Sequence, residues 1–152
     1  DRLCLVELAL ALEVQRQVVD VRHDLVILRT QAEFVESHVE LAGRLEGSAI
    51  RVPTPNVSAV DLTFIAQKSV TVAEVNEIVR EACQGYMGMV MAYDPEPKVS
   101  IDFNHTPQSS IFAPDQTKVA GRSVRVLAWY DNEWGFSCRM ADVAGVLGRL
   151  AQ

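Results

Sequence analysis

Two polar side chains, Arg51 and Asn132, have types and settings that suit ligand binding. Arg51 lies inside a strand-like run, Ile50-Arg51-Val52, directly before two prolines. A guanidinium held on a rigid element can bind phosphate oxygens in pairs through its fork of donors. An ion pair with a nearby carboxylate is the alternative role, and spacing alone favours that alternative.

Asn132 follows a predicted strand and opens a predicted helix, within the aromatic stretch WYDNEWGFS. Its side chain could cap the helix. Its amide could also bind a ligand at the end of a strand, a common ligand position in α/β proteins. By itself the pattern favours the cap. Trp129 and Trp134 are expected to be core anchors whose indole N–H groups reach a partner.

The three cysteines, Cys4, Cys83 and Cys138, are widely spaced, and no CxxC pair occurs. The pattern predicts neither a disulfide framework nor a zinc site, and it favours a reducing compartment. Cys83 is predicted to be a small buried apolar residue. Cys138 lies in the first turns of the last predicted helix, where a thiol pKa can be lowered. No histidine is near it in sequence, so Cys138 is a poor candidate nucleophile.

The three histidines belong to no catalytic motif, and the glycines form no phosphate-binding loop. His105 lies in a predicted turn, where it is expected to be exposed, and His23 and His38 lie outside any motif. No GxGxxG loop and no P-loop occurs in the sequence. The sequence therefore indicates no dinucleotide-binding or triphosphate-binding loop of the usual kind.

The composition and net charge of the chain indicate which kinds of binding partner are unfavourable. The chain has 152 residues, of which 49% are hydrophobic, so it can bury a core in one domain. Its net charge of -6 disfavours nucleic acids and anionic membranes, because both attract basic surfaces. The apolar run Leu3–Val14 is shorter than the roughly 20 residues of a membrane span, and it lacks the features of a signal peptide. Because the first residue is Asp1, we expect a processed, excised or incomplete start.

The first quarter of the chain reads differently from the rest. Residues 1–37 contain no glycine and no proline, and their pattern does not decide between helix and strand. Residues 38–47 predict a short helix closed by Gly47. Residues 49–67 predict extended chain, because Pro53 and Pro55 exclude a helix there.

The middle of the chain predicts one helix and several strands. Thr71 to Glu74 form a capping box, and Gly85 is expected to end the helix in a left-handed conformation. Its apolar face comprises Val72, Val75, Ile78, Val79 and Ala82. Strands are predicted at 86–93, 98–104 and 124–130, the last after a turn at Gly121-Arg122-Ser123.

A final helix is predicted to begin near Asn132–Glu133. Its apolar stripe comprises Phe136, Met140, Val143, Leu147 and Leu150. The whole order of elements predicts an α+β fold, with helices on one face of a mostly antiparallel or mixed sheet.

Three longer strings add a resemblance to a known family. They are AIRVPTPNVSAVDLTF (Ala49–Phe64), DFNHTPQSSIF (Asp102–Phe112) and WYDNEWGFSCRM (Trp129–Met140). In this order they resemble the C-terminal, catalytic domain of the glyceraldehyde-3-phosphate dehydrogenase family. The resemblance covers residues 38–152 and leaves 1–37 as an unassigned segment. The family's NAD-binding Rossmann half has no counterpart in this chain.

The resemblance implies NAD-dependent oxidation and phosphorylation of an aldehyde phosphate in glycolysis. Arg51 resembles the arginine that binds the phosphate of the substrate or inorganic phosphate. Asn132 resembles the asparagine that hydrogen-bonds the nicotinamide carboxamide of NAD or NADP, and Phe136 stands where the family places an aromatic ring beside the nicotinamide. A homo-oligomer, as in the family's homotetramer, and a cytoplasmic location are also implied.

The departures from the family limit what this chain can do. The family's nucleophile motif, S-C-T-T-N-C, is absent, and no cysteine has that context, so we assign no catalytic residue. The chain alone is expected to be inactive and to bind NAD poorly, because one amide hydrogen bond contributes only about 1 kcal/mol. The alternatives are a non-catalytic fragment or fusion that acts through oligomer assembly, and erythrose 4-phosphate as the substrate.

Overall fold

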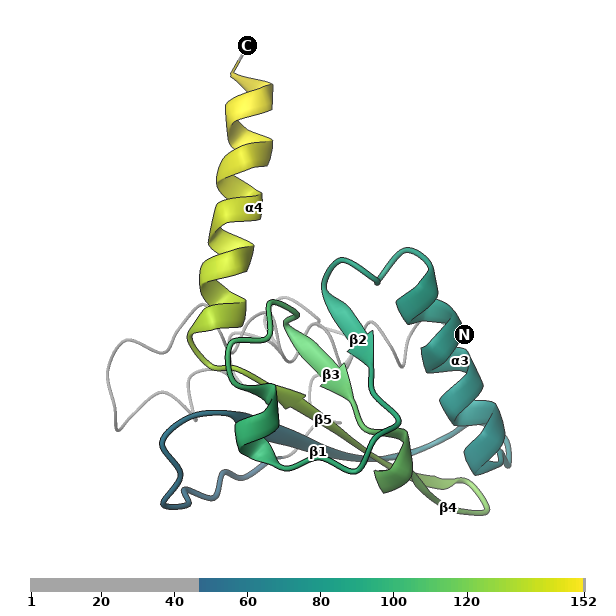
Figure 1. Ribbon diagram of the computed structural model, residues 1–152. Coiled ribbons are helices and arrows are strands. Elements are labelled where there is room, and N and C mark those ends of the chain that lie inside the picture. The colour runs from purple at the N-terminus through teal and green to yellow at the C-terminus, as the bar shows by residue number, and fades with distance from the viewer. Residues whose placement is uncertain (1–46, 152) are drawn as a thin grey trace.

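The computed structural model describes residues 47–151, which are arranged around one mixed β-sheet (Figure 1). Its strands are β1 (Ser58–Ile65), β2 (Met91–Tyr93), β3 (Ser110–Phe112), β4 (Lys118–Ala120) and β5 (Ser123–Tyr130). The strand order is β1-β5-β3-β2, and β4 pairs with β5. Only β2 and β3 run parallel; the other pairs are antiparallel. The predicted α+β class with a mostly antiparallel sheet is confirmed.

The two longest strands, β1 and β5, pair along their whole length, and β5 also pairs with β3 and β4. Their register runs from Ser58 opposite Tyr130 to Ile65 opposite Ser123. The start of β1 therefore lies beside the end of β5. The predicted turn before β5 is confirmed, and Gly121 adopts a positive φ of 61° there, a conformation that glycine adopts without steric cost.

Helix α3 (Val72–Gln84) packs on the sheet beside β2. The predicted capping box is present: Thr71 Oγ1 accepts from the Glu74 N–H at 3.2 Å, and Glu74 Oε2 accepts from the Thr71 N–H at 2.8 Å. The side chains that α3 buries are Val75, Val79 and Ala82, which join a core with Met87, Met91 and Phe112. Gly85 follows the helix with φ of −105°, so the predicted left-handed stop is wrong.

Two of the predicted strands are wrong over most of their length. In the segment 86–93 only β2 is a strand, because Gly85 and Met87 carbonyls accept from the N–H groups of Gly88 and Met91 and form turns. Gly88 is required in these turns, since a Cβ there would lie 2.5 Å from a backbone oxygen. The segment 98–104 contains the 3-10 helix η2 (Ser100–Phe103). Asp102 Oδ2 accepts from the Val99 N–H at 2.8 Å, a local bond that competes with strand pairing.

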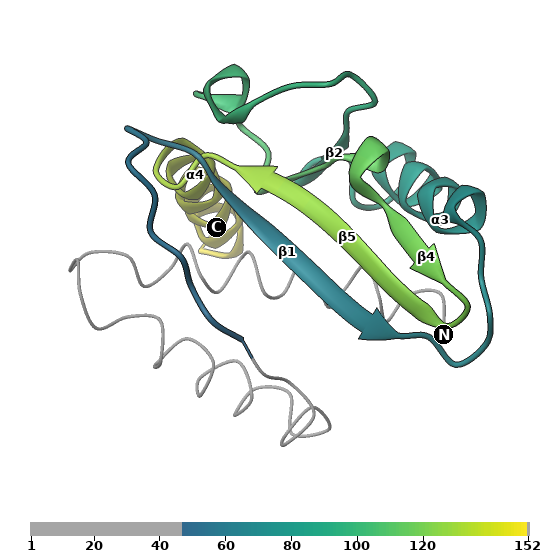
Figure 2. The same cartoon turned by 90° about the horizontal axis from the view of Figure 1, so that it is seen from below.

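Helix α4 (Trp134–Leu150) begins close to the predicted position and extends away from the sheet (Figures 1 and 2). Its apolar stripe is therefore exposed: the relative exposures are 58% for Met140, 58% for Val143, 61% for Leu147 and 77% for Leu150. Within residues 47–151, no helix combines the length and the apolar character that crossing a membrane requires.

Several predictions concern residues outside 47–151. These are the unassigned segment 1–37, the helix over 38–47 apart from Gly47, and the residues Cys4, His23 and His38.

Candidate functional site

The predicted ligand-binding residues come from segments that meet at one end of the β1–β5 pair. Arg51 precedes β1, Asn132 follows β5, and Phe136 lies in the first turn of α4. Because Ser58 pairs with Tyr130, the chain enters β1 and leaves β5 at the same end of the sheet.

Arg51 does not lie in a strand, contrary to the sequence prediction. The segment before β1 is irregular, and Thr54 N–H donates to the Val52 carbonyl at 2.8 Å across Pro53. Proline carries no N–H for a ladder bond, which explains why pairing starts only after Pro55. The Arg51 side chain is exposed and forms no ion pair with a carboxylate of residues 47–151.

The N-cap position of α4 is Glu133, and the side chain that bonds the start of the helix is that of Asp131, not that of Asn132. Asp131 Oδ1 accepts from the N–H groups of Glu133 at 3.0 Å and Trp134 at 2.8 Å. Asn132 is half-buried, and its Oδ1 is a buried acceptor with no donor among the described residues. Ser110 Oγ on β3 is in the same situation. A buried acceptor without a donor lowers the stability of the fold, and such an atom often has a role, for example in binding a ligand.

Asp131 is the residue that sequence analysis missed. It is completely buried, and its Oδ2 accepts from the His105 N–H at 2.7 Å and from Asn56 Nδ2 at 2.9 Å. Burial alone would raise the pKa of this carboxyl, but the hydrogen bonds from Trp134, His105, Glu133 and Asn56 outweigh burial and lower the pKa. An aspartate just before a helix is a preferred cap, so the sequence did contain a signal for part of this role.

Strained backbone surrounds this carboxylate. Asn56 Nδ2 also donates to Asn104 Oδ1 at 2.7 Å, and the residue after each asparagine has a positive φ. The φ angles are 69° for Val57, which is 3% exposed, and 61° for His105. A positive φ is unusual for a β-branched residue. Such strain costs about 1–3 kcal/mol per residue and is found most often at functional sites.

The tryptophans support the site less directly than the sequence suggested. Trp129 is half-buried and stacks on Phe103, with ring centroids 5.5 Å apart. Trp134 is 47% exposed, so its prediction as a core anchor is wrong; its ring lies 5.4 Å from that of His105. His105 is exposed in a turn, as predicted. The segment around Asn132 is therefore held by the hydrogen bonds of Asp131 more than by an aromatic box.

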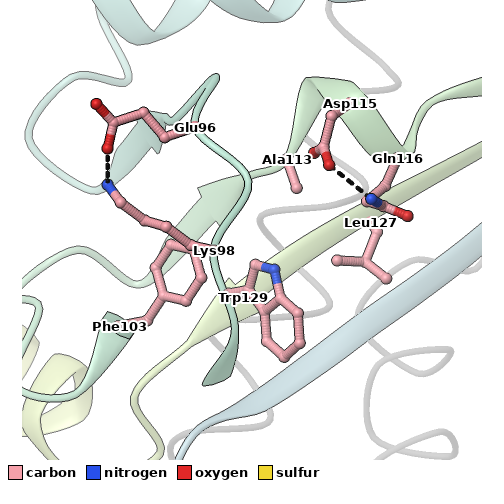
Figure 3. A pocket seen from close by; sticks show the side chains of 8 residues that line it. All are labelled: Glu96, Lys98, Phe103, Ala113, Asp115, Gln116, Leu127 and Trp129. Carbon is pink, nitrogen blue, oxygen red and sulfur yellow. Dashed lines mark hydrogen bonds and ion pairs between the residues drawn. The ribbon is translucent and has the colours of Figure 1, made fainter. Parts of the chain in front are cut away.

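A separate pocket of about 200 Å³ lies on the sheet (Figure 3). Phe103, Leu127 and Trp129 provide apolar walls, and Lys98 at the rim forms ion pairs with Glu96 and with Asp94. The pKa of Lys98 is raised by its hydrogen bonds to these two carboxylates. Because the lysine is already neutralised, and the lining includes none of the predicted ligand residues, this pocket is not the candidate site.

Neither described cysteine resembles an activated nucleophile. Cys138 is half-buried in α4, and Cys83 is half-buried against the core of α3. Burial raises the pKa of the Cys83 thiol to about 11. This agrees with its predicted role as a small core residue, since the thiolate is the reactive form.

We predict that Cys83 alkylates slowly. At pH 8 a thiol with that pKa is about 0.1% ionised, against about a quarter for an ordinary thiol. Its rate with iodoacetamide, followed by peptide mass spectrometry, should be at least about 100-fold below that of a cysteine-containing model peptide. A rate equal to that of the peptide would show that Cys83 is exposed and ionisable.

Comparisons with known proteins agree with the architecture. The family model for the glyceraldehyde 3-phosphate dehydrogenase C-terminal domain matches residues 30–132, which is more than half of the chain and includes Arg51 and Asn132. A glyceraldehyde-3-phosphate dehydrogenase of Cereibacter sphaeroides is 60% identical over 112 residues, covering 73% of this chain and 34% of the relative.

Two further relatives carry the same name. The protein of Xanthobacter flavus is 54% identical over 112 residues, covering 73% of this chain and 33% of its own length. The protein of Pseudomonas aeruginosa is 56% identical over 105 residues, covering 69% of this chain and 31% of its own length. The chain thus spans about a third of the length of the relatives that it matches. These matches show that the chain belongs to the glyceraldehyde 3-phosphate dehydrogenase family, within that family's C-terminal domain.

Proposed function

We propose that the chain supplies ligand-binding residues to an oxidoreductase that converts an aldehyde phosphate and inorganic phosphate into an acyl phosphate, with NAD as the cofactor. In this role Arg51 binds a phosphate, Asn132 binds the nicotinamide carboxamide and Phe136 lies beside the nicotinamide ring. The buried Oδ1 of Asn132, which has no donor within residues 47–151, is the observation that carries the proposal.

The chemistry of Asn132 fits a nicotinamide. A carboxamide has two N–H donors, and Asn132 Oδ1 needs one donor. A hydrogen bond between them would satisfy this acceptor and fix the rotation of the carboxamide, and with it the face of the ring. When bound, the nicotinamide accepts a hydride from the substrate; the contribution of Asn132 is orientation.

The setting of Arg51 fits a phosphate. Its guanidinium is exposed and unpaired among residues 47–151, so no internal carboxylate competes with an anion. Arginine binds phosphate oxygens through two parallel hydrogen bonds. The segment of Arg51 leads into β1 at the end of the sheet where the chain leaves β5 for Asn132, which suits a site where phosphate and cofactor lie near one substrate.

The nucleophile is not part of this proposal. The family motif S-C-T-T-N-C does not occur in the sequence, and the burial of Cys83 disfavours its thiolate. We therefore propose binding and orientation as the role of this chain, which alone should form no product and bind NAD weakly. A cytoplasmic location and the choice between NAD and NADP remain predictions.

A chimera tests the proposed residues. Residues 48–151 replace the matching segment of the Cereibacter sphaeroides relative, and steady-state kinetics are measured with glyceraldehyde 3-phosphate, NAD and phosphate. Arg51→Ala should raise the KM of a phosphate-bearing substrate at least about tenfold, because a hydrogen bond to a charged group contributes about 1.5–3 kcal/mol. Asn132→Ala should raise the KM of NAD about fivefold.

Arg122→Ala is the matched control for Arg51. Arg122 is also exposed, but it donates to the Ala66 carbonyl at the opposite end of β1. This variant should leave both KM values unchanged. Equal kinetics for the Arg51 and Arg122 variants would refute the proposed phosphate contact.

The substrate is proposed to be glyceraldehyde 3-phosphate, since the relatives carry that name. Erythrose 4-phosphate is the alternative. The chimera should turn over glyceraldehyde 3-phosphate faster, and equal rates would leave that preference without support.

A second candidate function is assembly without catalysis. The exposed apolar stripe on α4 favours it, because a surface of this kind promotes association. The proposed partner is a second copy of the chain, in line with the homo-oligomer that family membership implies. Sedimentation of the chain tests this function, and a monomer at all concentrations would count against it.

A further inference from the structure

We infer that Asn56 and Asp131 are positioning residues that hold the Asn132 amide in its binding orientation. The inference rests on the proposed function, because it assigns the support of the nicotinamide contact. Nothing in the sequence motif alone connects Asn56 with Asn132, which lie 76 positions apart in the chain. The connection is made by the hydrogen bonds of one buried carboxylate.

Asp131 fixes the backbone on both sides of Asn132. Asp131 is itself the preceding residue, and its Oδ1 accepts from the N–H groups of the two following residues at 3.0 and 2.8 Å. These bonds close a tight turn around Asn132. The direction in which the Asn132 side chain leaves the turn therefore depends on where the Asp131 carboxylate is held.

The other oxygen of Asp131 is held by two different segments. Its Oδ2 accepts from the His105 N–H at 2.7 Å and from the Asn56 amide at 2.9 Å. Among these four donors, Asn56 provides the only side chain. The same Asn56 amide nitrogen donates to Asn104 Oδ1, so it binds the carboxylate and the 104–105 turn together.

Two residues with strained backbone indicate that the segments around the Asp131 carboxylate are held firmly in place. Val57 and His105, the residues that directly follow Asn56 and Asn104, have φ of 69° and 61°. Positive φ values at non-glycine residues persist only where surrounding interactions over-determine the backbone. Here those interactions are the hydrogen bonds to Asp131. The strained residues are therefore in the two segments that donate to Asp131 Oδ2: Val57 directly follows Asn56, and His105 itself donates its N–H.

Asn56 also connects the two proposed ligand contacts. It lies in the segment that carries Arg51, five positions further along the chain. The segment that binds a phosphate and the turn that binds the nicotinamide are thus attached to the same carboxylate. Asn56 does not itself contact a ligand in this scheme; it acts through Asp131.

The order of the Asn132 side chain is the direct test. In the 15N-labelled full chain, NMR relaxation gives the order parameter of the Asn132 side-chain amide. Asn56→Ala should lower this order parameter below about 0.6, the range of flexible groups. Unchanged order in Asn56→Ala would overturn the inference, whether or not NAD binds.

Asn76→Ala is the matched control. Asn76 is also half-buried and makes two side-chain hydrogen bonds, to the Pro114 carbonyl at 3.1 Å and from Thr117 Oγ1 at 2.7 Å. These bonds tie α3 to the 3-10 helix η3 (Pro114–Gln116), away from Asp131. Asn76→Ala should lose stability but leave the Asn132 order parameter unchanged. An equal fall in both variants would show a merely structural effect.

NAD itself separates this inference from the proposed function. Titration with millimolar NAD should shift the Asn132 amide resonances of the wild-type chain. Asn56→Ala should raise the dissociation constant of NAD at least about threefold, because a misplaced Asn132 would weaken its hydrogen bond to the nicotinamide. If NAD shifts wild-type Asn132 but binds Asn56→Ala and Asn76→Ala equally, the positioning role fails and the proposed function stands. If NAD leaves wild-type Asn132 unchanged while Asn56→Ala loosens it, the nicotinamide contact fails instead.

Discussion

Replacing Asp131 with alanine is expected to lower the free energy of unfolding of the chain by about 3–5 kcal/mol. The substitution removes both oxygens of the buried carboxylate and leaves four donors without this acceptor: three backbone N–H groups and the Asn56 amide. A domain of this size is stabilised by about 5–15 kcal/mol in total, so the loss would be a large part of it. Urea denaturation followed by circular dichroism measures the change.

Asp61→Ala is the control for Asp131→Ala. Asp61 also makes two short hydrogen bonds, both to Arg125 at 2.8 Å, but it is exposed on the surface of the sheet. Exposed ion pairs contribute little to stability, so its loss should be several times smaller. Equal losses for the two variants would contradict the central role of the buried carboxylate.

The pH dependence of stability gives a second test of Asp131. Its pKa is lower in the folded chain than the ordinary value of about 4. Its stabilising contribution is therefore complete above the unfolded-state pKa and disappears as the pH falls through the folded-state pKa. The difference in unfolding free energy between wild type and Asp131→Asn should be constant near neutral pH and shrink below about pH 4. A difference that persists unchanged at acid pH would show that the carboxylate charge is unimportant.

Placing two lysines on the exposed stripe of α4 is expected to abolish self-association of the chain. Val143 and Leu147 are 58% and 61% exposed, and they lie one turn apart on the same face. Burying one such side chain contributes about 1.5–3 kcal/mol. Val143→Lys combined with Leu147→Lys should therefore raise the dissociation constant at least about 100-fold, as measured by sedimentation equilibrium.

The matched control places two lysines on the opposite face of the same helix. Ala141 and Gly145 are both exposed, one turn apart, and outside the stripe. Ala141→Lys combined with Gly145→Lys adds the same charge and should leave association unchanged. If both double variants became monomers, charge rather than the apolar stripe would be responsible. A monomeric wild type would remove the basis of the assembly proposal.

Local patterns in the sequence predicted a good part of the fold. The capping box at Thr71 and the turn at Gly121 depend on neighbouring residues, and both are present. The extended chain predicted within 49–67 and the strand predicted at 124–130 are present as β1 and β5. These features depend on short-range geometry, which a single sequence contains.

The failed predictions have two different causes, one local and one in the packing of the chain. The strand expected over 98–104 became a 3-10 helix because Asp102 caps its own turn. The exposure of the α4 stripe depends on how the helix leaves the sheet, since periodicity only marks an apolar face and not what covers it.

The candidate site was predictable only in part. The resemblance of short sequence stretches to the family identified Asn132 and Arg51 as candidates. The segment that carries Arg51 enters β1 at the end of the sheet where the chain leaves β5 for Asn132. The capping role went to Asp131 instead of Asn132. Asn56 and the positive φ of Val57 carried no recognisable signal, because their function arises from bonds between segments 48 and 75 positions apart.

The most direct test of the central claim is an assay of the purified chain for NADH formation from glyceraldehyde 3-phosphate, NAD and inorganic phosphate. A cooperative urea transition first establishes that the chain is folded. We predict no NADH above the rate without protein, because the roles proposed for Arg51 and Asn132 are in binding and the sequence contains no nucleophile motif. NADH formation that a thiol-blocking reagent abolishes would contradict this, since Cys4, Cys83 or Cys138 would then perform the chemistry.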